Sequence, residues 1–207
     1  MTQGDDTTPT KPPDSAAAAP TVGVVNTANA ITVARILLIP VFIVLLVSNV
    51  PYGSWLAIVV FGVAAFTDRL DGYVARSRNQ VTPLGQFLDP LADKLLISAA
   101  LIALVGLDKF PAWVAMVIIA REFAVSALRI VGVDQGVSIP ASRLGKAKTI
   151  SQIVGIIIFM WPVWHGRWFA PLIEDTAIVV MVALTLISGI QYFLRARDLL
   201  HAPGSPR

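Results

Sequence analysis

The sequence contains no cysteine, only two histidines and few charged residues. The lack of cysteine excludes disulfides and thiolate metal sites. Charged residues make up 14% of the 207 positions and hydrophobic residues 56%, whereas an average soluble domain has roughly 25% charged residues. The formal net charge of +3 is too small to indicate a nucleic-acid partner, and it suits a protein whose loops lie beside anionic lipid. The composition therefore predicts an integral membrane protein with one domain.

The two ends of the chain differ from its centre. Residues 1–24 are rich in threonine, proline, aspartate and alanine and have no apolar periodicity, so they predict a disordered tail. They also lack the basic and apolar regions of a secretory signal peptide. We expect one six-helix transmembrane domain over residues 25–200, followed by a short C-terminal tail over 201–207.

Long apolar stretches recur beyond the tail, separated by prolines and glycines that favour turns. A helix needs ~20 mostly apolar residues to cross a bilayer. Six stretches approach this length, which predicts an all-α polytopic membrane protein. They are residues 31–49, 54–75, 88–107, 111–131, 146–164 and 174–195.

Basic residues collect in the loops on one side of these predicted spans. Cytoplasmic loops carry the excess of lysine and arginine, so this side should face the cytoplasm together with both termini. The loop between the second and third spans lies on the same side. The side with more basic residues holds Arg76, Arg78, Arg143, Lys146, Lys148, Arg195 and Arg197, and the other side holds Lys109 and Arg167.

Four aspartates flank the loop between the second and third spans. Asp68 and Asp71 are three residues apart, and Asp89 and Asp93 are four apart, so on helices each pair shares a face. Ionisable groups beside the membrane are costly and usually mark function. Carboxylates without cysteine or nearby histidine suit Mg²⁺, Mn²⁺ or Ca²⁺ better than zinc. Two such ions, bridged by the carboxylates, would hold a phosphate group.

A simpler explanation of these aspartates stays open at this point. They would cap helices or pair with nearby basic residues such as Arg69, Arg76 and Lys94. Asp89 before Pro90 resembles a helix N-cap followed by proline at the first helical position.

Small residues follow the first aspartate pair. Gly72 comes directly after Asp71, and Ala75 lies about one turn further. Residues without bulk permit the close approach of a ligand or of another helix. Beside the acids, we favour room for a nucleotide base.

These residues form one extended pattern. D-x2-D-G-x2-A-R-x8-G-x3-D-x3-D, which runs from Asp68 to Asp93, resembles the signature of the CDP-alcohol phosphatidyltransferases position for position. The resemblance implies a six-helix membrane fold, two Mg²⁺ or Mn²⁺ ions and a homodimer. It implies that Asp68, Asp71, Asp89 and Asp93 bind metal, and that Asp93 is also the catalytic base. It further implies that CDP-diacylglycerol binds at Asp68, Asp71, Gly72, Ala75, Arg76, Thr82 and Gly85.

A second polar group lies in the fourth and fifth predicted spans. Arg121 and Arg129 are eight residues apart, which is about two helical turns, and Lys146 and Lys148 begin the next span. Guanidinium and ammonium groups together suit a phosphate, so we expect an acceptor alcohol that carries one. The alternatives are ordinary flanking charges for 142–149 and a structural ion pair between Arg121 and its neighbour Glu122.

The segments REF-x-VS-x-LR (121–129) and S-x-x-GK-x-KT (142–149) resemble those of bacterial family members that use sn-glycerol 3-phosphate as acceptor. This implies transfer of a phosphatidyl group from CDP-diacylglycerol, with release of CMP, at the cytoplasmic face of the bacterial plasma membrane. Two rivals share the fold: a cardiolipin synthase and a phosphatidylinositol phosphate synthase. A divalent-cation transporter is the non-enzyme alternative, but it should carry its acids near the bilayer midplane on several spans.

Overall fold

The computed structural model describes residues 27–48, 50–77, 83–134, 143–162 and 167–200, and within these ranges the regular structure is entirely helical. This confirms the predicted all-α class. The tails predicted over 1–24 and 201–207 lie outside the described residues. The helices are α1 (Thr27–Val47), α2 (Gly53–Ser77), α3 (Pro83–Gly106), α4 (Ala112–Asp134), α5 (Arg143–Met160) and α6 (Ala170–Leu200).

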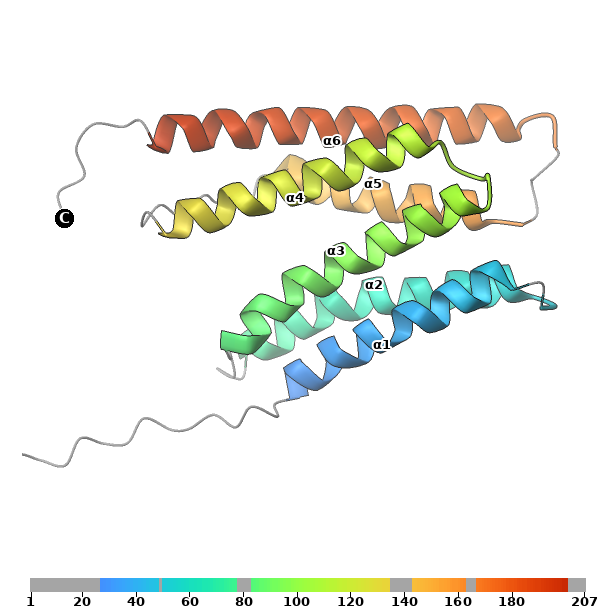
Figure 1. The fold of residues 1–207 in the computed structure, drawn as a ribbon, viewed down its shortest axis with the longest axis horizontal. Helices are drawn as coiled ribbons and strands as arrows, with labels where there is room; N and C mark the ends of the chain where they lie inside the picture. The colour runs from blue at the N-terminus through green and yellow to red at the C-terminus, as the bar shows by residue number, and fades with distance from the viewer. Residues whose placement is uncertain (1–26, 49, 78–82, 135–142, 163–166, 201–207) are drawn as a thin grey trace, which may run out of the picture.

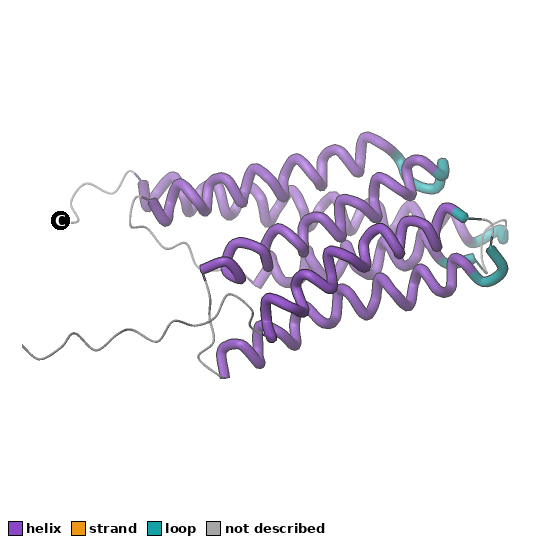
Figure 2. The backbone as a smooth tube through the Cα atoms, turned by 60° about the horizontal axis from the view of Figure 1, so that its bottom comes forward, coloured by secondary structure: helices purple, strands orange, loops and turns teal. Residues whose placement is uncertain are grey.

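The helices run along one long axis and alternate in direction (Figure 1). Helix α1 packs on α2 and α3, and α6 packs on α4 and α5. As a result α2 ends and α3 begins at the same end of the bundle at which α4 ends and α5 begins (Figures 1 and 2). We call this the aspartate end, because Asp68, Asp71, Asp89 and Asp93 lie towards it.

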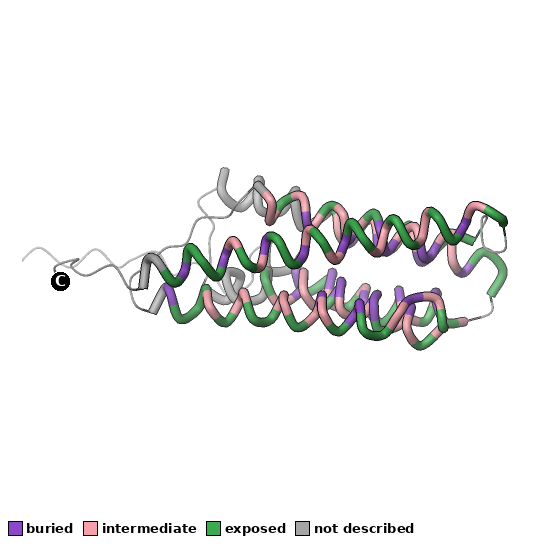
Figure 3. Tube along the Cα trace, turned by 90° about the horizontal axis from the view of Figure 1, so that it is seen from above, coloured by how far each residue is buried: buried purple, intermediate pink, exposed green. Residues whose placement is uncertain are grey.

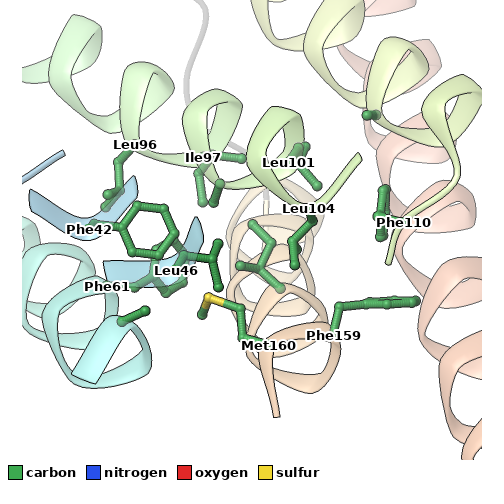
Figure 4. Packing of buried hydrophobic residues seen from close by; sticks show 14 of the residues in the cluster. Phe42, Leu46, Phe61, Leu96, Ile97, Leu101, Leu104, Phe110, Phe159 and Met160 are labelled. Carbon is green, nitrogen blue, oxygen red and sulfur yellow. The ribbon is translucent and has the colours of Figure 1, made fainter. Parts of the chain in front are cut away.

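The core lies between the helices and is built from apolar and aromatic side chains (Figure 4). The rings of Phe42 in α1 and Phe61 in α2 have centroids 5.6 Å apart. Phe110 meets Phe159 of α5 edge to face, with centroids 4.8 Å apart. Edge-to-face ring pairs are favoured by the ring quadrupoles, so the Phe110–Phe159 contact helps to fix α5 against the segment before α4.

Exposed positions run along the outside of the bundle (Figure 3), and many of them hold large apolar residues. A soluble monomer rarely exposes a contiguous apolar patch of more than a few hundred Å². By length and composition, Ala170–Arg197 is the one described helix that would cross a membrane, and Ile31–Val47 and Gly53–Thr67 are shorter apolar helices. The count of six spans therefore stays a prediction. Exposed apolar residues include Leu37, Val44, Val59, Val63, Ile102, Met116, Leu172, Val179 and Ile190.

Helix α3 begins earlier than the sequence suggested. The N-cap proposed for Asp89 is wrong, because Asp89 and Pro90 both lie inside α3, which begins at Pro83. Pro83 is tolerated at the start of α3, where its missing N–H would have no helical partner anyway. The carbonyl of Pro90 accepts a hydrogen bond from the Lys94 ammonium at 3.2 Å. Asp89 therefore has no capping role, which removes one part of the simpler explanation.

Close packing of α5 on α6 gives a stability prediction. A Cβ added at Gly155 of α5 would overlap the sulfur of Met181 and lie 3.0 Å from its Cγ, and Met181 is fully buried. Overpacking of this kind typically costs about 1–3 kcal/mol. We therefore expect Gly155→Ala to lower the thermal unfolding temperature of the purified protein in detergent.

Gly62 in α2 provides the matched control, because nothing lies within 4 Å of a Cβ added there. Alanine also has the higher helix propensity, so Gly62→Ala should unfold no earlier than the wild type. Equal unfolding temperatures for the two variants would contradict the tight contact at Gly155.

Candidate active site

The backbone places the four aspartates in two helices at the aspartate end. Asp68 and Asp71 lie in the second half of α2, and Asp89 and Asp93 lie in the first half of α3. Each pair therefore has the helical spacing that its shared face requires. The side chains of Asp68, Asp71 and Asp89 fall outside the description, and no group of three acidic or histidine side chains forms among the rest. The gathering of four carboxylates stays a prediction.

The predicted CDP-diacylglycerol residues have a similar status. Gly72, Ala75 and Arg76 lie in α2. Gly85 lies near the start of α3, so the backbone brings all four residues to the aspartate end. Their side chains, and all of Thr82, lie outside the described residues.

The structure brings two predicted phosphate-binding residues together at a carboxylate that joins α4 to α5. Glu122 Oε1 accepts a hydrogen bond from the ammonium of Lys148 and one from Arg121 at 3.3 Å. Only 4% of Lys148 is exposed, and the side chains of Arg121 and Glu122 are 14% and 12% exposed. We call these three residues the Glu122 cluster. The ion pair considered as an alternative is therefore present, but it includes a second cation.

Helix α6 supplies the other side of the Arg121 site. The guanidinium donates a hydrogen bond to Ser188 Oγ at 3.0 Å. A Cβ added at Gly189 would lie 3.3 Å from Arg121 Cγ, so the absence of a side chain at Gly189 leaves room for Arg121 against α6. The buried Nε of Arg121 has no hydrogen-bond partner among the described residues. The Nε–H lies against Gly189, so the N–H groups available to an anion are the second hydrogens of the two terminal nitrogens.

Asp93 lies on α3, a helix that packs against both helices of the Glu122 cluster, α4 and α5. The Asp93 carboxylate is near enough to Lys148 to attract it electrostatically. The predicted base therefore lies in the same region as Lys148, one of the four predicted phosphate-binding cations. That proximity is required if one acceptor molecule is to contact both.

The other two predicted cations differ from this pair. Arg129 lies two turns beyond Arg121 in α4, and Lys146 lies one turn from the start of α5. Both are exposed, in contrast to Lys148, which is buried. Their assignment to the acceptor phosphate stays a prediction.

Sequence reasoning missed three contributors to this region. It treated Glu122 only as a partner for Arg121, and it did not connect Ser188 or Gly189 with Arg121. The available sequence feature was a Ser-Gly pair within the apolar stretch of α6. Such a pair more often serves helix packing in membrane proteins, so it did not identify a site by itself.

Comparison with known proteins places these residues in a family. The sequence pattern described as CDP-alcohol phosphatidyltransferase matches residues 25–190. A relative from Bacillus subtilis (strain 168), named CDP-diacylglycerol--glycerol-3-phosphate 3-phosphatidyltransferase, is 42% identical over 187 residues, which cover 84% of this chain and 97% of the relative.

Relatives with the same name occur in other bacteria. One from Rickettsia typhi (strain ATCC VR-144 / Wilmington) is 37% identical and the match covers 81% of this chain and 95% of the relative. One from Shigella flexneri serotype 5b (strain 8401) is 37% identical, with 84% and 97% covered. The chain belongs to the CDP-alcohol phosphatidyltransferase family.

Proposed function

We propose that the protein transfers the phosphatidyl group of CDP-diacylglycerol to sn-glycerol 3-phosphate, which yields phosphatidylglycerophosphate and CMP. The observation that carries the choice of acceptor is the pair of cations Arg121 and Lys148, which share the Glu122 carboxylate, with Asp93 near enough to Lys148 to attract it. Guanidinium and ammonium donors suit an acceptor with its own phosphate. The names of the bacterial relatives support the same donor and acceptor.

We place the protein in the bacterial plasma membrane, as a multi-pass protein with both termini and the aspartate end at the cytoplasm. The apolar outer surface and the long apolar α6 support membrane insertion. The basic residues of the predicted loops support the orientation. We also infer a homodimer, on the resemblance to the family alone.

A divalent metal fits the donor set at the aspartate end. The predicted ligands are carboxylates, which are the hard oxygen donors that Mg²⁺ and Mn²⁺ prefer. Asp68, Asp71, Asp89 and Asp93 would hold two such ions, which would stabilise negative charge on the diphosphate and on the departing CMP.

The chain's own residues would handle the acceptor. Arg121 and Lys148 bind its phosphate, which directs its 1-hydroxyl towards Asp93. Asp93 takes the hydroxyl proton as the oxygen bonds to the β-phosphorus, the one that carries the diacylglycerol. The bond from this phosphorus to the bridging oxygen breaks, and CMP leaves with the electron pair. Gly72, Ala75 and Gly85 leave room for the cytidine diphosphate moiety.

Release of CMP tests the proposal directly. Purified protein in detergent receives CDP-diacylglycerol, Mg²⁺ or Mn²⁺, and one of three acceptors: sn-glycerol 3-phosphate, inositol 1-phosphate or phosphatidylglycerol. We expect sustained release with sn-glycerol 3-phosphate and only background release with the others. Release with phosphatidylglycerol or inositol 1-phosphate instead would assign one of the rival activities. No CMP with any acceptor, together with metal flux into vesicles, would favour a cation transporter.

A further inference from the structure

We propose that Glu122 is a positioning residue that holds Arg121 and Lys148 in place for the acceptor phosphate. The proposal rests on the proposed function. It addresses a conflict of charge, because a carboxylate in the middle of an anion site should repel the ligand. Within the cluster two cations face one anion. The nearby Asp93 carboxylate is predicted to hold metal, which would offset its charge.

The contacts show how one carboxylate holds two donors from different helices. Both cations bind the same oxygen, Oε1 of Glu122, one from α4 itself and one from α5. Lys148 and Arg121 also repel each other, and both are largely withdrawn from water. Between neighbouring cations in a bundle of low polarity, a shared carboxylate is what keeps both donors close. Removal of its charge would let them separate.

The donors that remain free make this arrangement suitable for an anion. Glu122 and Ser188 each take one hydrogen from the two terminal nitrogens of the Arg121 guanidinium, which leaves a second N–H on each of these nitrogens. The ammonium of Lys148 has three donors, and Glu122 takes one of them. The acceptor phosphate would thus meet donors that are already fixed, which lowers the entropy lost on binding.

The alternative is a purely structural role, in which the Glu122 cluster only ties α4 to α5. That role predicts lower stability for any variant at Glu122 and unchanged affinity in the folded fraction. A positioning role predicts a selective loss of affinity for the acceptor. The two roles are therefore separated by which KM changes.

The test compares Glu122→Gln, which keeps the shape and removes the charge, with Glu122→Asp, which keeps the charge. Glu122→Gln should raise the KM for sn-glycerol 3-phosphate at least about tenfold, because charge-assisted hydrogen bonds are weakened. The KM for CDP-diacylglycerol should stay within about twofold, since its contacts lie elsewhere. Glu122→Asp should recover part of the loss.

Thr185→Val is the matched control. It removes the hydrogen bond that Gln152 donates to Thr185 at 3.3 Å, which is a buried polar contact between α5 and α6 without charge. We expect it to lower the unfolding temperature and to leave both KM values near those of the wild type. Comparison of unfolding temperatures then shows how much of the Glu122→Gln effect is loss of fold.

Calorimetric titration of the folded protein with sn-glycerol 3-phosphate measures binding without turnover. If the wild type binds and uses this acceptor, and Glu122→Gln retains its affinity or raises both KM values equally, the positioning role is overturned while the proposed function stands. If the wild type neither binds nor uses it, the proposed function fails, and the role of Glu122 fails with it. Selective loss in Glu122→Gln with partial recovery in Glu122→Asp supports both.

Discussion

Asp93→Asn should release CMP about 10²–10⁴ times more slowly than the wild type, which is the range expected for loss of a general base. The amide has almost the shape of the carboxylate but does not accept a proton at neutral pH. Asp93 lies in α3 near the aspartate end, and it is close enough to Lys148 to attract it. Initial rates of CMP release at saturating concentrations of both substrates measure the effect.

The control carries the same substitution at the opposite end of the bundle. Asp108 is exposed in the turn after α3, with a φ of 55°. Asparagine tolerates this left-handed conformation, so Asp108→Asn should fold and turn over normally. If Asp93→Asn also kept full turnover, Asp93 would not be the base. Unfolding temperatures of the two variants guard against a loss of fold.

Most of the fold could be predicted from the sequence, because a long apolar stretch indicates a helix that must bury its apolar surface or expose it to lipid. The predicted 111–131 and the observed α4 (Ala112–Asp134) differ by only a few residues. The ends of the helices were harder to predict, since hydropathy detects the apolar part of a helix and not its continuation into polar residues. Thus α6 extends to Leu200 through charged residues that are good helix formers.

Only part of the candidate site could be predicted from the sequence. Local spacing predicted that Arg121 and Lys148 would serve one phosphate, and the structure brings them to one carboxylate. The contacts that hold them join residues distant in sequence: Lys148 to Glu122 across 26 positions, and Arg121 to Ser188 across 67. Such contacts depend on how α4 packs against α5 and α6. The residue pattern within a single helix does not predict that packing.

Those long-range contacts give the second large prediction. We expect Arg121→Gln to raise the KM for sn-glycerol 3-phosphate by about 10- to 100-fold, since hydrogen bonds to charged groups contribute about 1.5–3 kcal/mol. The maximal rate should fall less than that of Asp93→Asn, because Arg121 binds the acceptor's phosphate and not its reacting hydroxyl. Steady-state kinetics with each substrate varied in turn provide both values.

The variant should fold, because Glu122 keeps its ion pair with Lys148 when Arg121 is lost. Arg195→Gln is the control, since Arg195 is exposed in the last turns of α6, at the same end of the bundle as the aspartates. It removes the same charge from the protein, so any general electrostatic attraction of the anionic acceptor falls equally in both variants. A similar KM in both would mean that Arg121 contributes only net charge. A KM for CDP-diacylglycerol that rose as far as that for the acceptor would instead place Arg121 at the diphosphate.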